Sequence, residues 1–395
     1  MKKGLTTTLT HMGSTISMPN ASMPKVAPLY MNAAYCFDDA ETLEAVGRGE
    51  REGYLYGRTS NPTNDCLREI LTAIDEGADS QVYSSGMGAI SMAVMSNIQA
   101  GDHIIANKVI FGTSYKFFRA ELRDKFGVEV SFVDFAHDDI EKYYKPNTKI
   151  VYMETIANPT IDVLDIRKVA ASAHAHGALL IVDNTFATPA VCRPLTLGAD
   201  MVVYSATKFM CGHSDILAGV IVANKKALIE HITDVGHSYG PIMRPFDAWL
   251  LIRSLRTLEL RVAQHSRNAM QAAEYFQGRK GIAHTLYPGL AASPAHAIAG
   301  EIFSRGLYGG MLSIDLGSEK NVNDVIRHFQ MVKLVPSLGA FTTTVSDTKT
   351  SHGAMTPAER ASSGLSDGLL RVSIGLENIE DIIEDFDQSM RKAGL

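Results

Sequence analysis

The chain has 395 residues, 46% of them hydrophobic and 20% charged, and a formal net charge of −6. It is long enough for a large core and more than one domain, and its acidic balance argues against a nucleic-acid-binding protein. It has no apolar run of the ~20 residues that a membrane helix needs, and its first residues lack the apolar segment of a signal peptide. Its four scattered cysteines form no CxxC pair, which predicts a cytoplasmic protein without a metal site.

Residues 1–60 are rich in Thr, Ser, Met, Pro and Gly and show little helical periodicity. A long irregular segment of this kind in a compact enzyme usually lies on another surface. We therefore expect residues 1–60 to form an N-terminal arm that contacts a partner subunit.

Residues 61–248 alternate helical stretches with short apolar runs bounded by Gly, Asp or Asn, which predicts an α/β domain with a mostly parallel seven-stranded sheet covered on both faces. Such sheets bind ligands beyond the carboxyl ends of their strands. The candidate strands are Gln81–Tyr83, His103–Ala106, Glu129–Val133, Ile150–Met153, Leu179–Val182, Met201–Tyr204 and Gly219–Val222.

Residues 249–395 are predicted to hold a long linking helix and a smaller C-terminal α/β domain. Pro245 opens a helical pattern from Phe246 to about Phe276. The Thr-, Ser- and Gly-rich stretch 337–364 is expected to be a loop that reaches a site. The other predicted elements are strands Gly310–Asp315 and Leu370–Ile374 and helices Asn321–Gln330 and Ile379–Lys392.

Two polar side chains at strand ends indicate the chemistry. Lys208 follows the candidate strand Met201–Tyr204, and Asp183 ends Leu179–Val182. A lysine can bind the aldehyde of a pyridoxal ring covalently, and an aspartate can keep the ring nitrogen protonated. Either residue alone is more often a solvated group, so the prediction depends on their occurring together in one sheet.

A glycine-bearing turn, Ser84–Ser91, follows the first candidate strand and opens a helix. Backbone N–H groups at such a turn can bind a phosphate, although a tight turn without a ligand is the ordinary explanation. The spacing Gly86-x-Gly88-x-x-Ser91 also nearly fits a dinucleotide fingerprint, but Ser91 replaces the third small residue and no acidic residue follows at the usual distance. A nicotinamide oxidoreductase and a cofactor-free scaffold therefore stay as alternatives.

Two arginines and two hydroxyls complete the candidate site. Ser205 and Thr207 stand just before Lys208 and could reach the same phosphate, as could Arg58. Arg371 lies inside an apolar strand, where an arginine needs an anion, either a substrate carboxylate or an internal Asp or Glu.

Together these segments resemble the Cys/Met-metabolism family of pyridoxal-phosphate (PLP) enzymes, which includes cystathionine γ-synthase, cystathionine lyases, methionine γ-lyase and homoserine-ester sulfhydrylases. The resemblance covers nearly the whole chain, and its motifs are specific for the family in combination. They are Tyr56–Arg58 with Ser60–Thr63, Ser85–Ala89, Glu154–Thr160, Val182–Phe186, Ser205–Lys208 with Gly212–Ser214, Ser337–Gly339 and Leu370–Gly375.

The resemblance implies a fold-type-I PLP enzyme, assembled as a homotetramer of two catalytic dimers. It gives the cofactor as pyridoxal 5'-phosphate, bound covalently by Lys208 and paired at its ring nitrogen with Asp183. It further implies that the phosphate is held by Gly86, Met87, Ser205 and Thr207, with Tyr56 and Arg58 from a partner subunit. Asn158 is expected near the ring hydroxyl, and Ser337 and Arg371 are expected to receive the substrate carboxylate.

The sequence departs from this family pattern at Phe111, where most members have a tyrosine that stacks on the cofactor and protonates the leaving group. Phe111 keeps the stacking face and loses the proton, a step typically worth ~10²–10⁴ in rate. Either another phenol serves, Tyr56 or Tyr115, or the leaving group departs as an anion, as from a homoserine ester. Thr342 stands where many members have a glutamate used towards the distal amine of cystathionine.

The sequence therefore predicts an enzyme acting on a small amino acid, with no nucleic-acid or membrane partner. We expect a PLP-dependent lyase catalysing γ-elimination on sulfur-containing or other homoserine-derived L-amino acids, with 2-oxobutanoate and ammonia as products. An oxygen-linked leaving group, as in canavanine, is included. The alternative is γ-replacement, by an O-acyl-homoserine sulfhydrylase or a cystathionine γ-synthase-type transferase. Lys208 and Tyr56 are the predicted catalytic residues.

Overall fold

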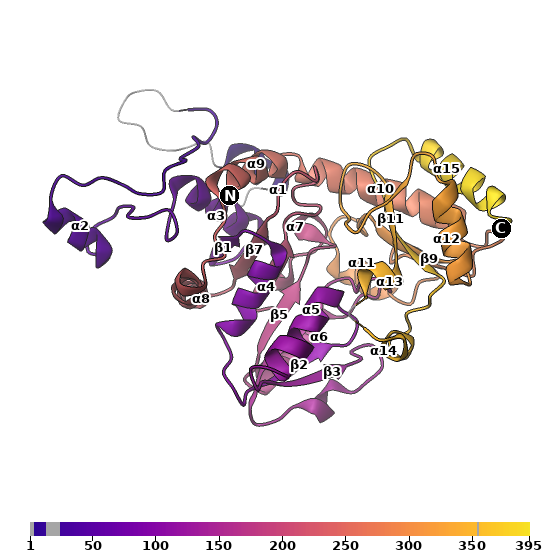
Figure 1. Ribbon diagram of the computed structural model, residues 1–395, viewed down its shortest axis with the longest axis horizontal. Coiled ribbons are helices and arrows are strands. Elements are labelled where there is room, and N and C mark those ends of the chain that lie inside the picture. The colour runs from indigo at the N-terminus through magenta and orange to yellow at the C-terminus, as the bar shows by residue number, and fades with distance from the viewer. Residues whose placement is uncertain (1–3, 13–23, 354) are drawn as a thin grey trace.

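The structure is a computed structural model that describes residues 4–12, 24–353 and 355–395. A large domain and a smaller one lie side by side, and helix α10 (Leu258–Phe276) runs from the first to the second (Figure 1). The large domain is built on a seven-stranded sheet and the smaller on a five-stranded sheet, which confirms the expected α/β architecture. Within the described ranges no helix has both the length and the apolarity needed to cross a membrane.

The seven-stranded sheet contains all seven strands that the sequence predicts within residues 61–248, in the order β1-β7-β6-β5-β4-β2-β3. Only β7 runs antiparallel to its neighbours, β1 and β6, so the sheet is mostly parallel. The strands are β1 (Asp79–Tyr83), β2 (His103–Asn107), β3 (Glu129–Val133), β4 (Thr148–Glu154), β5 (Leu179–Asp183), β6 (Met201–Ser205) and β7 (Gly219–Ala223).

The strands of this sheet are apolar on both sides because helices cover both faces. In β5, Leu180 and Val182 pack into one hydrophobic cluster while Ile181 packs into the other. One face is covered by α3 (Pro62–Asp75), α6 (Ile166–Ala175), α7 (Thr188–Val191) and α9 (Pro245–Leu255), and the other by α4 (Gly86–Met95), α5 (Gly112–Lys116) and α8 (Lys226–Tyr239). Short π and 3-10 helices complete this domain at Phe117–Arg123, Ile140–Tyr143 and Pro194–Leu197. Burying one Leu or Ile side chain completely contributes about 1.5–3 kcal/mol to the free energy of unfolding. Losing either helical layer would expose several such side chains of the sheet, so the domain depends on both layers.

The sheet topology brings distant parts of the sequence to one edge. Because all strands except β7 run the same way, the turns after β1, β2, β4, β5 and β6 leave the same edge of the sheet. Register pairing sets Glu154 of β4 directly beside Asp183 of β5. Ligand sites in such sheets form at this edge.

The N-terminal arm is less irregular than its composition suggests. Helix α1 (Leu5–His11) packs onto α3 of the same chain and buries Leu5 and Leu9 in the large core. Helix α2 (Ala40–Gly47) begins at Asp39, whose side chain accepts a hydrogen bond from Thr42 N at 2.6 Å. The segment carrying α2 projects away from the body of the chain (Figure 1).

The prediction of one long linking helix over 246–276 is wrong in one respect, because the helix is broken at Arg256 and Thr257 into α9 and α10. At the break, the carbonyl of Ser254 accepts from Thr257 N at 3.3 Å and from the guanidinium of Arg261 at 2.9 Å. The same guanidinium donates to the carbonyls of Phe209 at 2.7 Å and Met210 at 3.0 Å, so the break is tied to a distant turn of the large domain. Helix α9 packs on α3, so the expected boundary at residue 248 falls inside a helix of the large domain.

The smaller domain has strand order β10-β11-β12-β9-β8. The stretch 337–364 is not a plain loop, because it contains β11, α13 and α14; β11 forms by pairing with β12, which is distant in sequence. The elements of this domain are β8 (His284–Leu286), α11 (His296–Ile302), β9 (Met311–Asp315), α12 (Glu319–His328), β10 (Lys333–Leu334), β11 (Thr344–Asp347), α13 (Thr348–Ser351), α14 (Pro357–Ser362), β12 (Leu369–Ser373) and α15 (Ile379–Lys392).

Candidate active site

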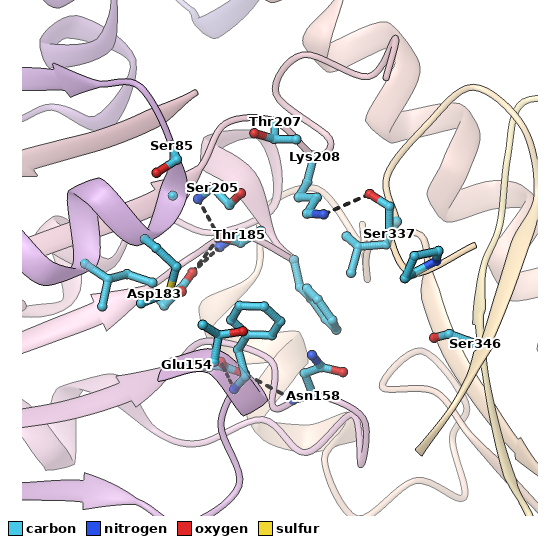
Figure 2. Close-up of a pocket in the computed structure, with 18 of the residues that line it drawn as sticks. Ser85, Glu154, Asn158, Asp183, Thr185, Ser205, Thr207, Lys208, Ser337 and Ser346 are labelled. Atoms are coloured by element: carbon cyan, nitrogen blue, oxygen red, sulfur yellow. Dashed lines mark hydrogen bonds between the residues drawn. The ribbon is translucent and has the colours of Figure 1, made fainter. Parts of the chain in front are cut away.

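A cavity of about 540 Å³ opens at the carboxyl edge of the large sheet and is closed on its other side by the smaller domain (Figure 2). Both domains contribute to its lining, from the turn after β1 to Arg371 on β12. Of the residues that the sequence proposes for the site, those in the cavity lining are Gly86, Met87, Phe111, Asn158, Asp183, Ser205, Thr207, Lys208, Ser337 and Arg371.

Lys208 lies on the turn after β6, with its amine directed across the cavity. Its Nζ donates a hydrogen bond to Ser337 Oγ of the smaller domain at 2.8 Å (Figure 2). Burial, and secondarily the positive charge of Arg371, lower the pKa of Lys208 to about 8. An appreciable fraction of this amine is therefore neutral near pH 7–8, as a nucleophilic or proton-accepting lysine requires.

Asp183 ends β5 on another wall of the cavity and is only 7% exposed. Its Oδ1 accepts hydrogen bonds from Thr185 N at 3.0 Å and from Thr185 Oγ1 at 2.5 Å, and its Oδ2 accepts a longer one from Tyr152 at 3.4 Å. Burial raises the pKa of Asp183, against the effect of these donors. A cationic partner would offset that cost of burial, so the site suits a positively charged ring nitrogen.

The start of α4 forms an anion cradle. Ser85 caps the helix by accepting from Gly88 N at 3.0 Å, while the N–H groups of Gly86 and Met87 have no acceptor among the described residues. A Cβ at Gly86 would lie 2.6 Å from Ser205 Cβ, so only glycine lets these two turns approach. Free N–H groups at a helix N-terminus, beside serine and threonine hydroxyls, are the donors that bind phosphate.

Arg371 is 5% exposed, and within the described part of the chain no carboxylate lies within ion-pair distance of it. Its guanidinium instead donates to Asn158 Oδ1 at 3.0 Å and to Ser337 O at 3.3 Å. Burial lowers the pKa of Arg371 to about 10. A buried cation whose acceptors among the described residues are all neutral can bind an anion from outside the chain, and this arrangement argues against an internal carboxylate as its partner.

Glu154, Thr185 and Ser346 also line the cavity, although the sequence analysis gave them no role in the site. Glu154 and Thr185 sit at the ends of β4 and β5, and Ser346 lies on β11 as the register partner of Arg371. The hydroxyl of Ser346 is buried and has no hydrogen-bond partner in the part of the chain that the structure describes. The sequence could have indicated Glu154 and Thr185 as site residues, because both stand close to the end of a strand, as Asp183 does. The position of Ser346 in the cavity depends on the pairing of β11 with β12, which the local sequence does not reveal.

Tyr56, Arg58 and Tyr115 lie outside the cavity lining. Tyr56 is 48% exposed at the end of the arm, with the guanidinium of Arg58 5.5 Å from its ring centre. Tyr115 points away, and its phenol donates to Glu359 at 3.1 Å. The prediction that Tyr115 could supply the missing proton is therefore wrong for this chain's own cavity.

The donor set fits pyridoxal phosphate. An amine of lowered pKa, a buried carboxylate, free N–H groups at a helix N-terminus and an aromatic ring at Phe111 line one cavity, and these are the kinds of group that an aldehyde, a ring nitrogen, a phosphate and a ring face require. A nicotinamide dinucleotide would instead need an acidic residue for its ribose after the glycine turn.

Comparison with known proteins gives the same chemistry. A model of the family described as Cys/Met metabolism PLP-dependent enzyme matches residues 6–391. An L-methionine gamma-lyase of Porphyromonas gingivalis is 38% identical over 395 residues, covering 99% of this chain and 98% of that protein. A cystathionine gamma-lyase of Bacillus subtilis is 38% identical over 351 residues, covering 88% and 92%.

Solved structures agree with the sequence relatives. Cystathionine gamma-lyase from Lactobacillus plantarum, complexed with L-serine, superposes with a TM-score of 0.92 at 31% identity, covering 99% of this chain and 100% of that one. Cystathionine gamma synthase from Xanthomonas oryzae, in complex with cystathionine, gives 0.92 at 33% identity with 99% of both chains covered.

Proposed function

The chain belongs to the Cys/Met-metabolism family of PLP-dependent enzymes, and from that membership we propose that it is a lyase catalysing γ-elimination on sulfur-containing or other homoserine-derived L-amino acids. Its fold is fold type I, its cofactor is pyridoxal phosphate, and it is an enzyme of the lyase and transferase chemistry of this family. The observation that carries the proposal is one cavity that holds a lysine of lowered pKa and a buried arginine, which has no carboxylate within ion-pair distance among the described residues.

The cofactor would bind with its aldehyde at Lys208 and its ring nitrogen at Asp183. Its phosphate would lie at Gly86, Met87, Ser205 and Thr207, its ring against Phe111, and its ring hydroxyl near Asn158. When bound, it supplies an electron sink for the carbanion formed at the substrate's Cα. The free N–H groups at the start of α4 and the burial of Asp183 support this orientation.

The substrate would be held by its α-carboxylate at Arg371 and Ser337. A guanidinium binds a carboxylate with two parallel hydrogen bonds, which fixes the direction of the amino acid as well as its position. Lys208 Nζ, already hydrogen-bonded to Ser337 Oγ at 2.8 Å, would then take protons from Cα and from Cβ. Its pKa of about 8 supports a role as acceptor and as donor near neutral pH.

The leaving group is the point at which this chain differs from most of its family. Among the described residues that line the cavity there is no tyrosine, so the chain's own cavity offers the leaving group no phenol. We propose that Tyr56 of a partner subunit supplies the phenol that the cavity lacks, or that the leaving group departs as an anion without being protonated. The carboxylate of a homoserine ester leaves as an anion more readily than a thiolate does, because a carboxylic acid has a much lower pKa than a thiol.

Assembly into a homotetramer of two catalytic dimers is part of the same proposal. It is supported by the projecting arm and by the exposure of Tyr56, which would let Tyr56 and Arg58 reach a partner's phosphate site. A cytoplasmic location is supported by four free cysteines, three of them buried.

The alternative function is γ-replacement, in which a thiol or sulfide adds after the γ-group has left. A cystathionine gamma synthase is among the close structural neighbours, and Phe111 is compatible with an ester leaving group. Elimination and replacement share the residues described above and differ in whether water or a second substrate completes the reaction.

A substrate panel distinguishes the two. The purified enzyme is incubated with methionine, homocysteine, cystathionine, canavanine and acylated homoserines, with and without sulfide, and products are scored as 2-oxobutanoate, ammonia or a new amino acid. Elimination predicts keto acid and ammonia without sulfide. Homocysteine formed from an acylated homoserine only when sulfide is present favours the transferase, and a Lys208→Ala variant is the matched blank. If no member of the panel gives any product, the proposal is contradicted.

A further inference from the structure

Glu154 is a buried carboxyl in the cavity wall with no role in the chemistry described so far. It ends β4 beside Asp183 and is 6% exposed. Each of its oxygens accepts one backbone N–H: Oε1 from Phe111 at 2.7 Å, and Oε2 from Asn158 at 3.1 Å (Figure 2). One side chain thus holds two turns, at Phe111 and Asn158, that are far apart in the sequence.

The two residues that Glu154 holds belong to different working parts of the site. Phe111 presents the aromatic face of the cavity, and its ring is 37% exposed, so packing alone does not fix it. No side-chain cap is seen for α5 among the described residues, and the turn at Phe111 is held by the bond to Glu154 and by a bond between His352 Nε2 and Ile110 O at 3.2 Å. Asn158 in turn accepts a hydrogen bond from Arg371 Nη1 at 3.0 Å. Glu154 is therefore linked to the aromatic face directly and to the carboxylate anchor through Asn158.

The charges around Glu154 make its position costly. Burial and the neighbouring Asp183 raise the pKa of Glu154 well above its usual range, and Arg371 opposes them. A buried carboxyl beside another is destabilising unless it is well hydrogen-bonded, and an apolar side chain of similar volume would avoid the cost. Such an apolar side chain could not join the turns of Phe111 and Asn158.

We propose that Glu154 is a positioning residue that fixes the aromatic face at Phe111 and the carboxylate anchor at Arg371 in one relative geometry. The inference rests on the proposed function, because it assumes that Arg371 binds the substrate carboxylate. Glu154 contacts neither the substrate nor the cofactor in this role. Its effect on binding should therefore depend on the presence of Arg371.

The test is a binding measurement on the holoenzyme with L-2-aminobutanoate, an amino acid that has no γ-leaving group. Binding is followed through the change in the visible absorbance of the cofactor. In Glu154→Gln one oxygen becomes an amide nitrogen that faces an N–H donor, so one of the two turns is released. Because misplaced positioning groups typically cost 10–100-fold, we expect the Kd to rise roughly tenfold or more. Glu141→Gln, at an exposed carboxyl bound by Ser172 and His176, should leave the Kd unchanged.

A double-mutant cycle separates positioning from a general loss of structure. In an Arg371→Met background, Glu154→Gln should raise the Kd by a clearly smaller factor than it does in the wild type, since the anchor at Arg371 is gone and only the aromatic face at Phe111 is left for Glu154 to position. Two fully additive effects would overturn the inference, as would a Glu154→Gln enzyme that binds L-2-aminobutanoate as tightly as the wild type. If Glu154→Gln does not fold, Glu154→Asp is used instead, because it keeps a carboxyl group on a side chain one methylene shorter, which should not span both N–H groups. Unchanged binding in that variant also overturns the inference.

This outcome is distinct from a failure of the proposed function. If the wild-type holoenzyme shows no spectral response to L-2-aminobutanoate, amino-acid binding at this cavity is wrong. If the wild type responds and the Glu154 variants respond equally, only the positioning role is wrong.

Discussion

Replacing Phe111 with tyrosine tests how the leaving group departs. The ring of Phe111 lines the cavity and is 37% exposed, so a hydroxyl can be added without overpacking the core. The backbone bond to Glu154 at 2.7 Å holds the turn in either variant. The change therefore adds one proton donor to a cavity that has no phenol among its described lining residues.

The expected magnitude follows from the chemistry of the two leaving-group classes. A general acid typically contributes ~10²–10⁴ in rate where the leaving group is a poor anion, and much less where it leaves readily. A phenol with an ordinary pKa of about 10 can protonate a departing thiolate, whereas a carboxylate leaving from an ester needs no proton. We expect Phe111→Tyr to raise kcat/KM for cystathionine or methionine, relative to an acylated homoserine, by at least about tenfold, which is the lower part of that range.

The assay measures initial rates of 2-oxobutanoate formation for one thioether and one ester substrate in both enzymes. Tyr115→Phe is the matched control, because it changes one phenolic hydroxyl four residues away that bonds to Glu359 instead of facing the cavity. Its substrate ratio should equal that of the wild type. A ratio unchanged in Phe111→Tyr would refute the reasoning that acid catalysis at this position limits thioether cleavage.

Three further predictions follow from other parts of the structure. Lys208→Ala should remove the visible absorbance of the cofactor–lysine linkage and abolish turnover, and an enzyme that still turns over would contradict the role of Lys208. Arg371→Lys replaces a two-pronged donor with a point charge, and because charge-assisted hydrogen bonds contribute ~1.5–3 kcal/mol, kcat/KM should fall about 10–100-fold, mainly through KM; a change confined to kcat would argue against carboxylate binding. Asp75 is buried, accepts from Tyr204 at 2.5 Å, and has its pKa raised to about 7 by burial, so the folded state binds a proton that the unfolded state has released. Stability should therefore fall by up to ~1.4 kcal/mol per pH unit from about pH 4 to about pH 7 and stay level above that. Asp75→Asn should reduce this slope, as measured by urea unfolding at about pH 5 and pH 7, and an unaltered slope would assign it to other groups.

The sequence by itself determined the large sheet and the order of its site residues. Short apolar runs rich in Val and Ile, bounded by Gly, Asp and Asn, predict parallel strands because both faces of such a sheet are buried. Lys208 and Asp183 stand at strand ends, and parallel strands bring their carboxyl ends to one edge, so their meeting in one cavity could be inferred without coordinates.

Only the tertiary structure decided which groups are hydrogen-bonded to each other across that cavity. Glu154 and Asp183 are neighbours because of the register of β4 and β5, and Ser346 faces the cavity because β11 pairs with β12. Tyr115 is turned away because a glutamate 244 positions later binds its phenol. Local sequence sets the type of an element, whereas these contacts depend on strand register and domain packing, which are fixed by apolar burial over the whole chain.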